Sequence, residues 1–140
     1  MELYLMDVSH EFEDDGIETY VYDIVVPSLE RTVGRCEYRV ESGQDLRYYG
    51  NIGYVIYVPY RGHHFAYKAC LALIALMKGK IKGLQEIVIT CNPENIASKK
   101  TIQKLGCDYI ETVDIDPRHE LFRMGDVQKE VYVLNLSDNT

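Results

Sequence analysis

Gly53-Tyr-Val-Ile-Tyr-Val-Pro-Tyr-Arg-Gly-His-His-Phe-Ala66 is the stretch that decides the fold, because an apolar strand runs through a proline straight into a helix. Pro59 has no N–H to donate to a strand ladder, and the residues after Ala66 are strong helix formers. A helix that starts this abruptly leaves unpaired N–H groups, to which the helix dipole adds roughly half a positive charge. Gly62 would let a ligand come close to the backbone. The turn predicts a phosphate or pyrophosphate site, although an ordinary strand–helix junction has the same pattern.

The segments on either side of this turn predict a mixed sheet. Upstream, β-branched and aromatic residues predict a meander of strands at 18–27, 32–41 and 51–58, with turns at 28–31 and 42–45. Residues 1–16 are predicted to be irregular. Downstream, the pattern predicts a helix at 62–77, a strand at 85–91, a helix at 95–105, and strands at 107–115 and 127–136. We therefore expect an α/β (α+β) mixed sheet with helices packed on it, as a single domain over residues 1–140.

Charge is distributed unevenly along the chain, whose net charge is −7 and whose pI is about 5.0. Residues 1–30 hold nine acidic side chains and no Lys or Arg, whereas residues 59–104 hold eight basic side chains against two acidic ones. The basic middle suits a phosphorylated ligand, and the acidic front suits a cationic one or is simply a solvated surface. An acidic chain is a poor partner for nucleic acid, so none is expected.

Cofactors other than an organic phosphate are not indicated. The four cysteines are widely spaced with no CxxC pair, and the adjacent His63 and His64 have no partner at metal-ligand spacing, so we expect no metal. The longest apolar run is about half of what spans a bilayer, and the N-terminus lacks a basic and apolar leader. A cytoplasmic protein with no membrane segment is the expectation.

A second motif begins where the strand at 85–91 leads into the next helix. Asn92, Pro93 and Asn95 can cap and start this helix, and Gly106 can end it. Asn95 and Ser98 lie three residues apart, on one face of the first turn, where both could reach a ligand along the sheet. Helix capping alone would explain the same pair of residues.

Together the two motifs resemble those of the GNAT superfamily of N-acetyltransferases, whose domains bind acetyl-CoA. Arg61 and Ala66 match the pyrophosphate turn of that family, while His64 stands where a Gly is expected. Asn95, Ser98, Lys104 and Gly106 match the second helix, while Cys107 replaces an aromatic residue. The resemblance covers roughly residues 18–136.

The resemblance implies that the strands at 51–58 and 85–91 splay apart around the thioester of acetyl-CoA. Backbone groups of Ile56, Tyr57 and Val58 would hold the pantetheine arm, with Asn95 and Ser98 beside it. The pyrophosphate would lie on the amides of Gly62, His63, His64, Phe65 and Ala66. The His64 side chain would either crowd the pyrophosphate or donate a hydrogen bond to it.

Two departures from the family pattern bear on catalysis. Ile102 stands where the family often has a Tyr that protonates the leaving thiolate, so the acid comes from elsewhere or the thiolate leaves unassisted. Only about 17 residues precede the first long strand, so the acceptor side is predicted to be open or completed by a second subunit, as in a homodimer. Glu37 is the candidate base, although a solvent-facing strand residue would show the same pattern. Tyr57, Tyr67 and Tyr132 are the candidate acids.

Three functions follow from these residues. The first is an N-acetyltransferase that moves acetyl from acetyl-CoA to a primary amine of a small molecule or protein by direct attack. The second is a non-catalytic module that binds CoA or acetyl-CoA. The third is an interaction domain that uses the fold only as a scaffold.

Overall fold

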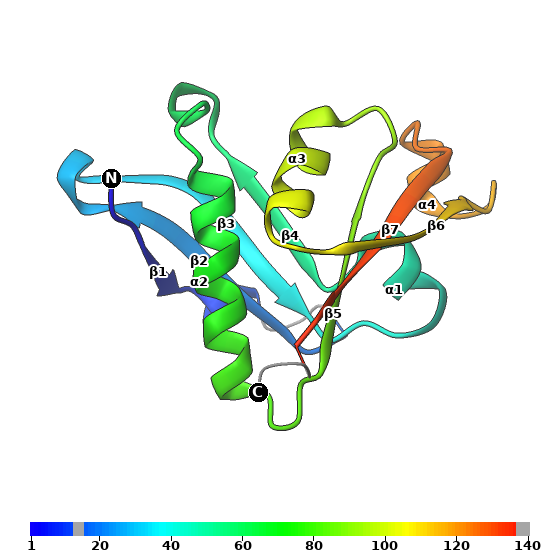
Figure 1. Cartoon of the computed structure of the whole chain (residues 1–140), viewed down its shortest axis with the longest axis horizontal. Helices are drawn as coiled ribbons and strands as arrows, with labels where there is room; N and C mark the ends of the chain where they lie inside the picture. The colour runs from blue at the N-terminus through cyan, green and yellow to red at the C-terminus, as the bar shows by residue number, and fades with distance from the viewer. Residues whose placement is uncertain (13–15, 137–140) are drawn as a thin grey trace.

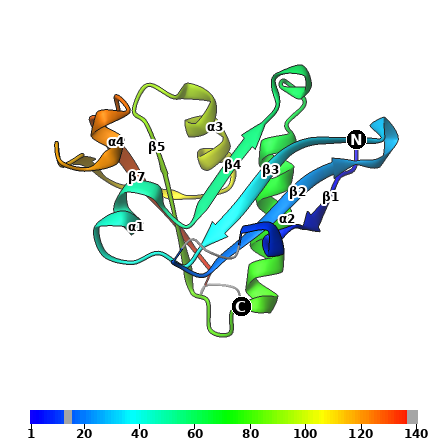
Figure 2. The same ribbon diagram turned by 180° about the vertical axis from the view of Figure 1, so that it is seen from behind.

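The strands form two separate antiparallel sheets in a computed structural model that describes residues 1–12 and 16–136. The first sheet has the order β1-β2-β3-β4, with the strands Tyr4–Asp7, Thr19–Val26, Arg31–Arg39 and Ile52–Ile56. The second has the order β5-β7-β6, with the strands Glu86–Cys91, Gln128–Asn135 and Asp108–Asp114. Figures 1 and 2 show that β4 and β5 lie close at one end and diverge toward the other.

Helices cover both faces of this arrangement. The longest, α2 (Phe65–Lys80), packs on the first sheet, and α3 (Ile96–Lys104) follows β5. The short helices α1 (Gly43–Tyr49) and α4 (Glu120–Arg123) lie on the opposite side of the second sheet. Three 3-10 turns complete the described elements: η1 (Ser9–Phe12), η2 (Pro27–Leu29) and η3 (Val58–Tyr60).

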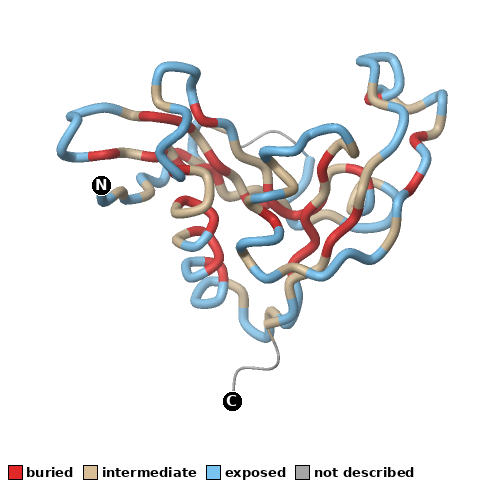
Figure 3. Tube along the Cα trace, turned by 45° about the horizontal axis from the view of Figure 1, so that its top comes forward, coloured by how far each residue is buried: buried red, intermediate tan, exposed pale blue. Residues whose placement is uncertain are grey.

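The position of β5 between two hydrophobic clusters explains why its residues form a continuous apolar run. Ile87 and Ile89 face the large cluster under α2 and α3, whereas Val88 faces a smaller cluster under α1 and α4. A strand that is buried on both faces needs apolar residues at successive positions. Figure 3 shows buried residues concentrated along α2 and the inner strands.

The mixed α/β fold, the meander and the helix–strand alternation are confirmed, with four corrections. Residues 42–45 are not a simple turn, because α1 starts at Gly43 and its Tyr48 is buried against the second sheet. The N-terminal region, predicted to be irregular, contains β1, an edge strand of four residues that is too short to show an alternating pattern. The helix α4 was not anticipated. The expected sheet is divided in two because β4 and β5 part instead of pairing.

Asn51 joins the two sheets where they part. Its backbone N–H donates to the Val88 carbonyl at 2.6 Å, and its side-chain oxygen accepts from the Val88 N–H at 2.8 Å. Its side-chain N–H donates to the Arg39 carbonyl at 2.9 Å, in place of the backbone bond that β3 would otherwise receive. At the preceding Gly50, an added Cβ would lie 2.8 Å from the Val88 carbonyl oxygen, so the two strands meet here backbone to backbone. Beyond this point the sheets are free to diverge.

The described residues form neither a membrane-spanning helix nor a group of potential metal ligands. Within residues 1–12 and 16–136, no helix is long and apolar enough to cross a membrane. Across the same ranges, no group of three or more His, Cys, Asp or Glu side chains is arranged to hold a metal ion.

Candidate active site

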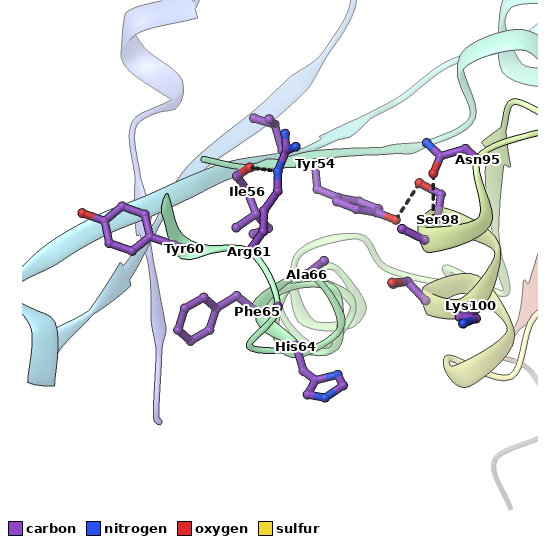
Figure 4. Close-up of a pocket in the computed structure, with 14 residues that line it drawn as sticks. Tyr54, Ile56, Tyr60, Arg61, His64, Phe65, Ala66, Asn95, Ser98 and Lys100 are labelled. Carbon is purple, nitrogen blue, oxygen red and sulfur yellow. Dashed lines mark hydrogen bonds between the residues drawn. The ribbon is translucent and has the colours of Figure 1, made fainter. Parts of the chain in front are cut away.

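A cavity of about 540 Å³ lies at the open end of the splay, between β4, the η3 turn and the N-terminal ends of α2 and α3 (Figure 4). Both sequence motifs contribute to its walls. The lining residues are Tyr54, Val55, Ile56, Tyr60, Arg61, Gly62, His64, Phe65, Ala66, Asn95, Ala97, Ser98, Lys100 and Thr101. Most of the residues predicted to bind a cofactor are therefore brought together, whereas Tyr57, Val58 and His63 do not line the cavity.

The N-terminal end of α2 forms one end of the cavity. The backbone of His64 has a φ of 62°, in the left-handed region that a Gly adopts without strain. This explains why a Gly is expected there and shows that the turn forms without one. The first recorded helical bond runs from the Lys68 N–H to the His64 carbonyl at 3.2 Å, so the amides before Lys68 are those that a helix leaves unpaired.

The mouth of the cavity is cationic. Arg61 and Lys100 both line it, from the η3 turn and from α3. The Arg61 Nε–H donates to the Ile56 carbonyl at 3.0 Å, which holds the guanidinium beside the open edge of β4 (Figure 4). An anion at the start of α2 would meet both the helix dipole and these side chains.

The register of β4 decides which of its backbone groups face the cavity. The Tyr57 N–H donates to the Val33 carbonyl at 2.8 Å, so the backbone of Tyr57 is directed to β3. Backbone direction alternates along a strand, so the N–H and carbonyl of Tyr54 and Ile56 are directed to the open edge instead. The Tyr57 carbonyl accepts from the Tyr60 N–H at 2.9 Å and helps to form η3. The backbone N–H and carbonyl groups of Tyr54 and Ile56, rather than those of Tyr57, therefore lie at the edge where a ligand could pair with the strand.

The start of α3 faces this ladder across the cavity. The Asn95 side-chain oxygen accepts from the Ser98 N–H at 3.1 Å, so Asn95 caps the helix and also lines the cavity. The Tyr54 hydroxyl donates to the Ser98 hydroxyl oxygen at 3.3 Å, which links β4 to α3 (Figure 4). Burial raises the pKa of Tyr54, so its hydroxyl stays protonated at neutral pH.

None of the predicted catalytic residues lines the cavity. Glu37 is directly opposite Gly53 in the β3–β4 register, and its carboxylate forms an ion pair with Arg39 at 2.8 Å. Side chains alternate along β4, so Gly53 and Glu37 share the sheet face opposite to that of Tyr54. Arg39 also donates to the Tyr49 carbonyl at 2.7 Å. Tyr57 is 39% exposed at the end of β4.

Sequence reasoning missed several cavity residues: Tyr54, Tyr60, Ala97, Lys100 and Thr101. Two signals could have found some of them. Tyr54 alternates with Ile56, so both must face one side of the strand. Ala97, Lys100 and Thr101 follow helical spacing and share one face of α3. Ile102, by contrast, is 1% exposed, which explains why an apolar residue stands there.

Comparison with known proteins gives one family match. The sequence profile of a family described as "Acetyltransferase (GNAT) domain" matches residues 4–108. A comparison with curated proteins found no match.

Solved structures with the same fold share little sequence with this chain. An acetyltransferase of the GNAT family from Bacillus anthracis superposes with a TM-score of 0.66 at 20% identity, over 82% of this chain and 65% of that one. A ribosomal-protein-S5-alanine acetyltransferase from Vibrio fischeri has a TM-score of 0.67 at 18% identity, over 87% and 64%. The microcin C7 self-immunity acetyltransferase MccE, solved with acetyl-CoA and AMP, has a TM-score of 0.66 at 15% identity, over 84% and 61%. The chain thus spans less than two thirds of each of these structures, and at these identities the likeness shows the fold.

Proposed function

The chain belongs to the acetyltransferase (GNAT) family, and from that membership we propose that it transfers the acetyl group of acetyl-CoA to a primary amine. One observation carries the proposal. The pyrophosphate turn and the start of α3, which lie about 30 residues apart in sequence, form the walls of a single cavity beside an open strand edge. CoA combines an anionic pyrophosphate with an extended arm that carries amide groups. The cavity combines a helix N-terminus flanked by cationic side chains with the open backbone edge of β4.

Each part of the cavity has a role in this proposal. The amides of Gly62 to Ala66 and the Arg61 and Lys100 side chains hold the pyrophosphate. The backbone of Tyr54 and Ile56 pairs with the pantetheine arm as an added strand would. Arg61 leaves the Ile56 carbonyl when the arm pairs there. The thioester then lies in the splay between β4 and β5, open to an amine from the opposite face of the sheet.

Acyl transfer requires a base for the attacking amine. The amine must lose a proton as its nitrogen bonds to the acyl carbon. Glu37 lies on the acceptor side of the first sheet, and its carboxylate is our candidate for that proton. Arg39 holds the Glu37 side chain in one orientation through the 2.8 Å ion pair.

The acceptor is proposed to be a small-molecule or protein amine. The acidic N-terminal stretch at residues 1–30 suits a cationic acceptor such as a polyamine or an aminoglycoside. Similar structures include acetyltransferases of ribosomal proteins, which adds a protein amine to those worth testing. A second copy of this chain would complete an open acceptor side, and light scattering with and without acceptor would detect such a homodimer.

A non-catalytic CoA-binding module is the second candidate. Two observations favour it: the Glu37 carboxylate is already paired with Arg39, and the side chain at 102 is an inert, buried Ile. Such a module would bind CoA and acetyl-CoA and release no thiol with any amine.

Calorimetric titration of acetyl-CoA tests the placement of the pyrophosphate. We expect Arg61→Glu to weaken binding at least tenfold, because it puts a carboxylate beside the pyrophosphate. Lys82→Glu is the matched control, since it makes the same charge change on an exposed side chain beyond the far end of α2. Unchanged affinity in Arg61→Glu would refute this placement.

Thiol release separates the two candidates. The wild-type chain is incubated with acetyl-CoA and spermidine, kanamycin or peptides with free N-termini, and free CoA is measured. Amine-dependent release indicates the transferase, and tight binding without release indicates the module. Absence of acetyl-CoA binding would remove both.

A further inference from the structure

We propose that the closed end of the splay, away from the cofactor cavity, holds a second binding site for an aliphatic diamine or polyamine. A cavity of about 300 Å³ lies there, where the end of β3, the start of β5 and the turn after α2 meet (Figure 1). It shares no described lining residue with the cavity between β4 and α3. The proposed acetyl transfer does not use it.

Three glutamates give the wall of this second cavity a negative charge. Glu18, Glu41 and Glu86 line it from just before β2, just after β3 and the start of β5. The described lining residues include no Lys, Arg or His. In the part of the chain that the structure describes, none of the three carboxylates forms an ion pair. The remaining residues, 13–15 and 137–140, contain no Lys or Arg to supply a cation. The cavity therefore attracts cations.

The surroundings of Glu41 are unfavourable for its charge. Burial raises the pKa of its carboxyl and the nearby Asp45 carboxylate raises it further, while Arg39 partly offsets this shift. Glu18 accepts a hydrogen bond from a neutral group, the Tyr20 hydroxyl. A cation bound in the cavity would stabilise the ionised form of these carboxylates, which neutral partners do less well.

The Tyr38 hydroxyl is an independent feature that points to a ligand in the same place. Tyr38 is 4% exposed, and its ring packs in the core while the residue lines the cavity. Among residues 1–12 and 16–136, its hydroxyl has no hydrogen-bond partner. It is not sealed in the core like the unpartnered Tyr22 hydroxyl, so it is directed into the cavity that Tyr38 lines. Buried tyrosine hydroxyls normally find a partner, and a bound ammonium group would donate to this one.

The other walls of the cavity select an organic cation over a metal ion. They are apolar and include Ile81, Leu84 and Val88. Methylene groups are stabilised by contact with such side chains, whereas a hydrated metal ion is not. The three carboxylates come from separate segments around the cavity, so a ligand that meets more than one of them carries spaced positive charges. Ammonium groups joined by a methylene chain have both properties.

Calorimetric titration of the full chain with putrescine tests this site. No acetyl-CoA is present, so the result does not depend on the proposed transfer. Butylamine is the matched monoamine, with the same number of carbons and one ammonium group fewer. We expect putrescine to bind about tenfold more tightly, which is the difference made by one additional charge-assisted hydrogen bond. If Mg²⁺ binds as tightly as putrescine, the cavity responds to charge alone and the proposal is refuted.

Glutamine substitutions locate the bound diamine. Glu41→Gln and Glu86→Gln should each weaken putrescine binding about tenfold, because each removes one carboxylate partner. Both also remove a repelling charge, so the folded chain should tolerate them. Glu94→Gln is the control, since Glu94 is an exposed glutamate that does not line the cavity. The control should bind putrescine like wild type, and equal losses in all three variants would show attraction to the whole acidic chain instead of a site.

Two further variants separate this site from the acceptor side. Putrescine is also a candidate acceptor, and Glu37 faces the opposite side of β3 from Tyr38. Glu37→Gln should retain putrescine binding; a loss there with none in Glu41→Gln would place the diamine on the acceptor side and overturn the second site. Tyr38→Phe should weaken binding about threefold, as loss of one neutral hydrogen-bond partner does. Unchanged affinity in Tyr38→Phe would contradict the role of the hydroxyl, and a wild-type chain that binds no putrescine would end the proposal.

Discussion

Backbone strain at single residues accompanies the candidate site. His64 is one of two non-glycine residues with positive φ among the described residues, and the other is Glu30, with a φ of 52° in the β2–β3 connection. A side chain in the left-handed region costs roughly 1 kcal/mol. At His64 the left-handed conformation turns the chain into α2, whose first amides then face the cavity. At Glu30 the same conformation only closes the hairpin between β2 and β3.

Replacing either residue with Gly should therefore stabilise the fold. We expect His64→Gly and Glu30→Gly each to raise the free energy of unfolding by about 1 kcal/mol, since Gly adopts the same φ without the Cβ clash. Urea unfolding measures this change. Glu30→Gly should leave acetyl-CoA affinity unchanged, because the residue does not line the cavity. Destabilisation of both variants would show that the positive φ values are not strained.

At the scale of elements, the splay of β4 and β5 depends on one buried side chain. Asn51 is 7% exposed and supplies both a donor and an acceptor where the strands separate. A continuous β4–β5 ladder would close the cavity, and complete separation would expose the core. The side-chain amide of Asn51 takes the place of a peptide group for Arg39 and Val88.

Asn51→Ala should be costly for this reason. It leaves the Arg39 carbonyl and the Val88 N–H without their side-chain partner in a buried place, which we expect to cost roughly 2–4 kcal/mol of unfolding free energy. Asn95→Ala provides the comparison, because it removes an exposed helix cap worth about 1 kcal/mol. Urea unfolding measures the free energy of unfolding of both variants. If Asn51→Ala and Asn95→Ala lose equal amounts, the role given to Asn51 is contradicted.

At the scale of the whole molecule, buried thiols make the free energy of unfolding depend on pH. Burial raises the pKa of Cys36 and Cys70 to about 12 and that of Cys107 to about 11, from an ordinary value of 9.0. These groups remain neutral in the folded chain and ionise in the unfolded chain above pH 9. Their contribution to stability is complete below pH 9 and is lost as the pH rises toward 12.

Alkaline destabilisation should weaken when one thiol is removed. Where a thiol is ionised in the unfolded chain and neutral in the folded chain, the free energy of unfolding falls by up to about 1.4 kcal/mol for each pH unit. Cys70→Ala should lower this slope between pH 9 and pH 11 by about that amount. The constant cost of the smaller side chain cancels when slopes, rather than absolute values, are compared by urea unfolding. Identical slopes in wild type and variant would show that Cys70 ionises alike in both states.

Local chemistry determined much of this protein from sequence alone. Alternation in β2 and β3 reflects one buried face, and the apolar run of β5 reflects burial on both faces. The helix formers of α2 act through interactions between near neighbours. The strand–turn–helix at Pro59 to Ala66 and the capped start of α3 are likewise local, so both motifs were predictable. The edge strand β1 and the short helices α1 and α4 were not, because exposed or brief elements carry no periodic pattern.

The tertiary structure decided how these pieces make a site. It placed Tyr54 opposite Ser98, turned the Tyr57 backbone away from the cavity and paired Glu37 with Arg39 on the opposite face of the sheet. Each of these facts depends on strand register and on where β4 parts from β5. Register depends on contacts between residues far apart in sequence, and at Asn51 on a side chain that replaces a backbone bond. No local pattern contains that information.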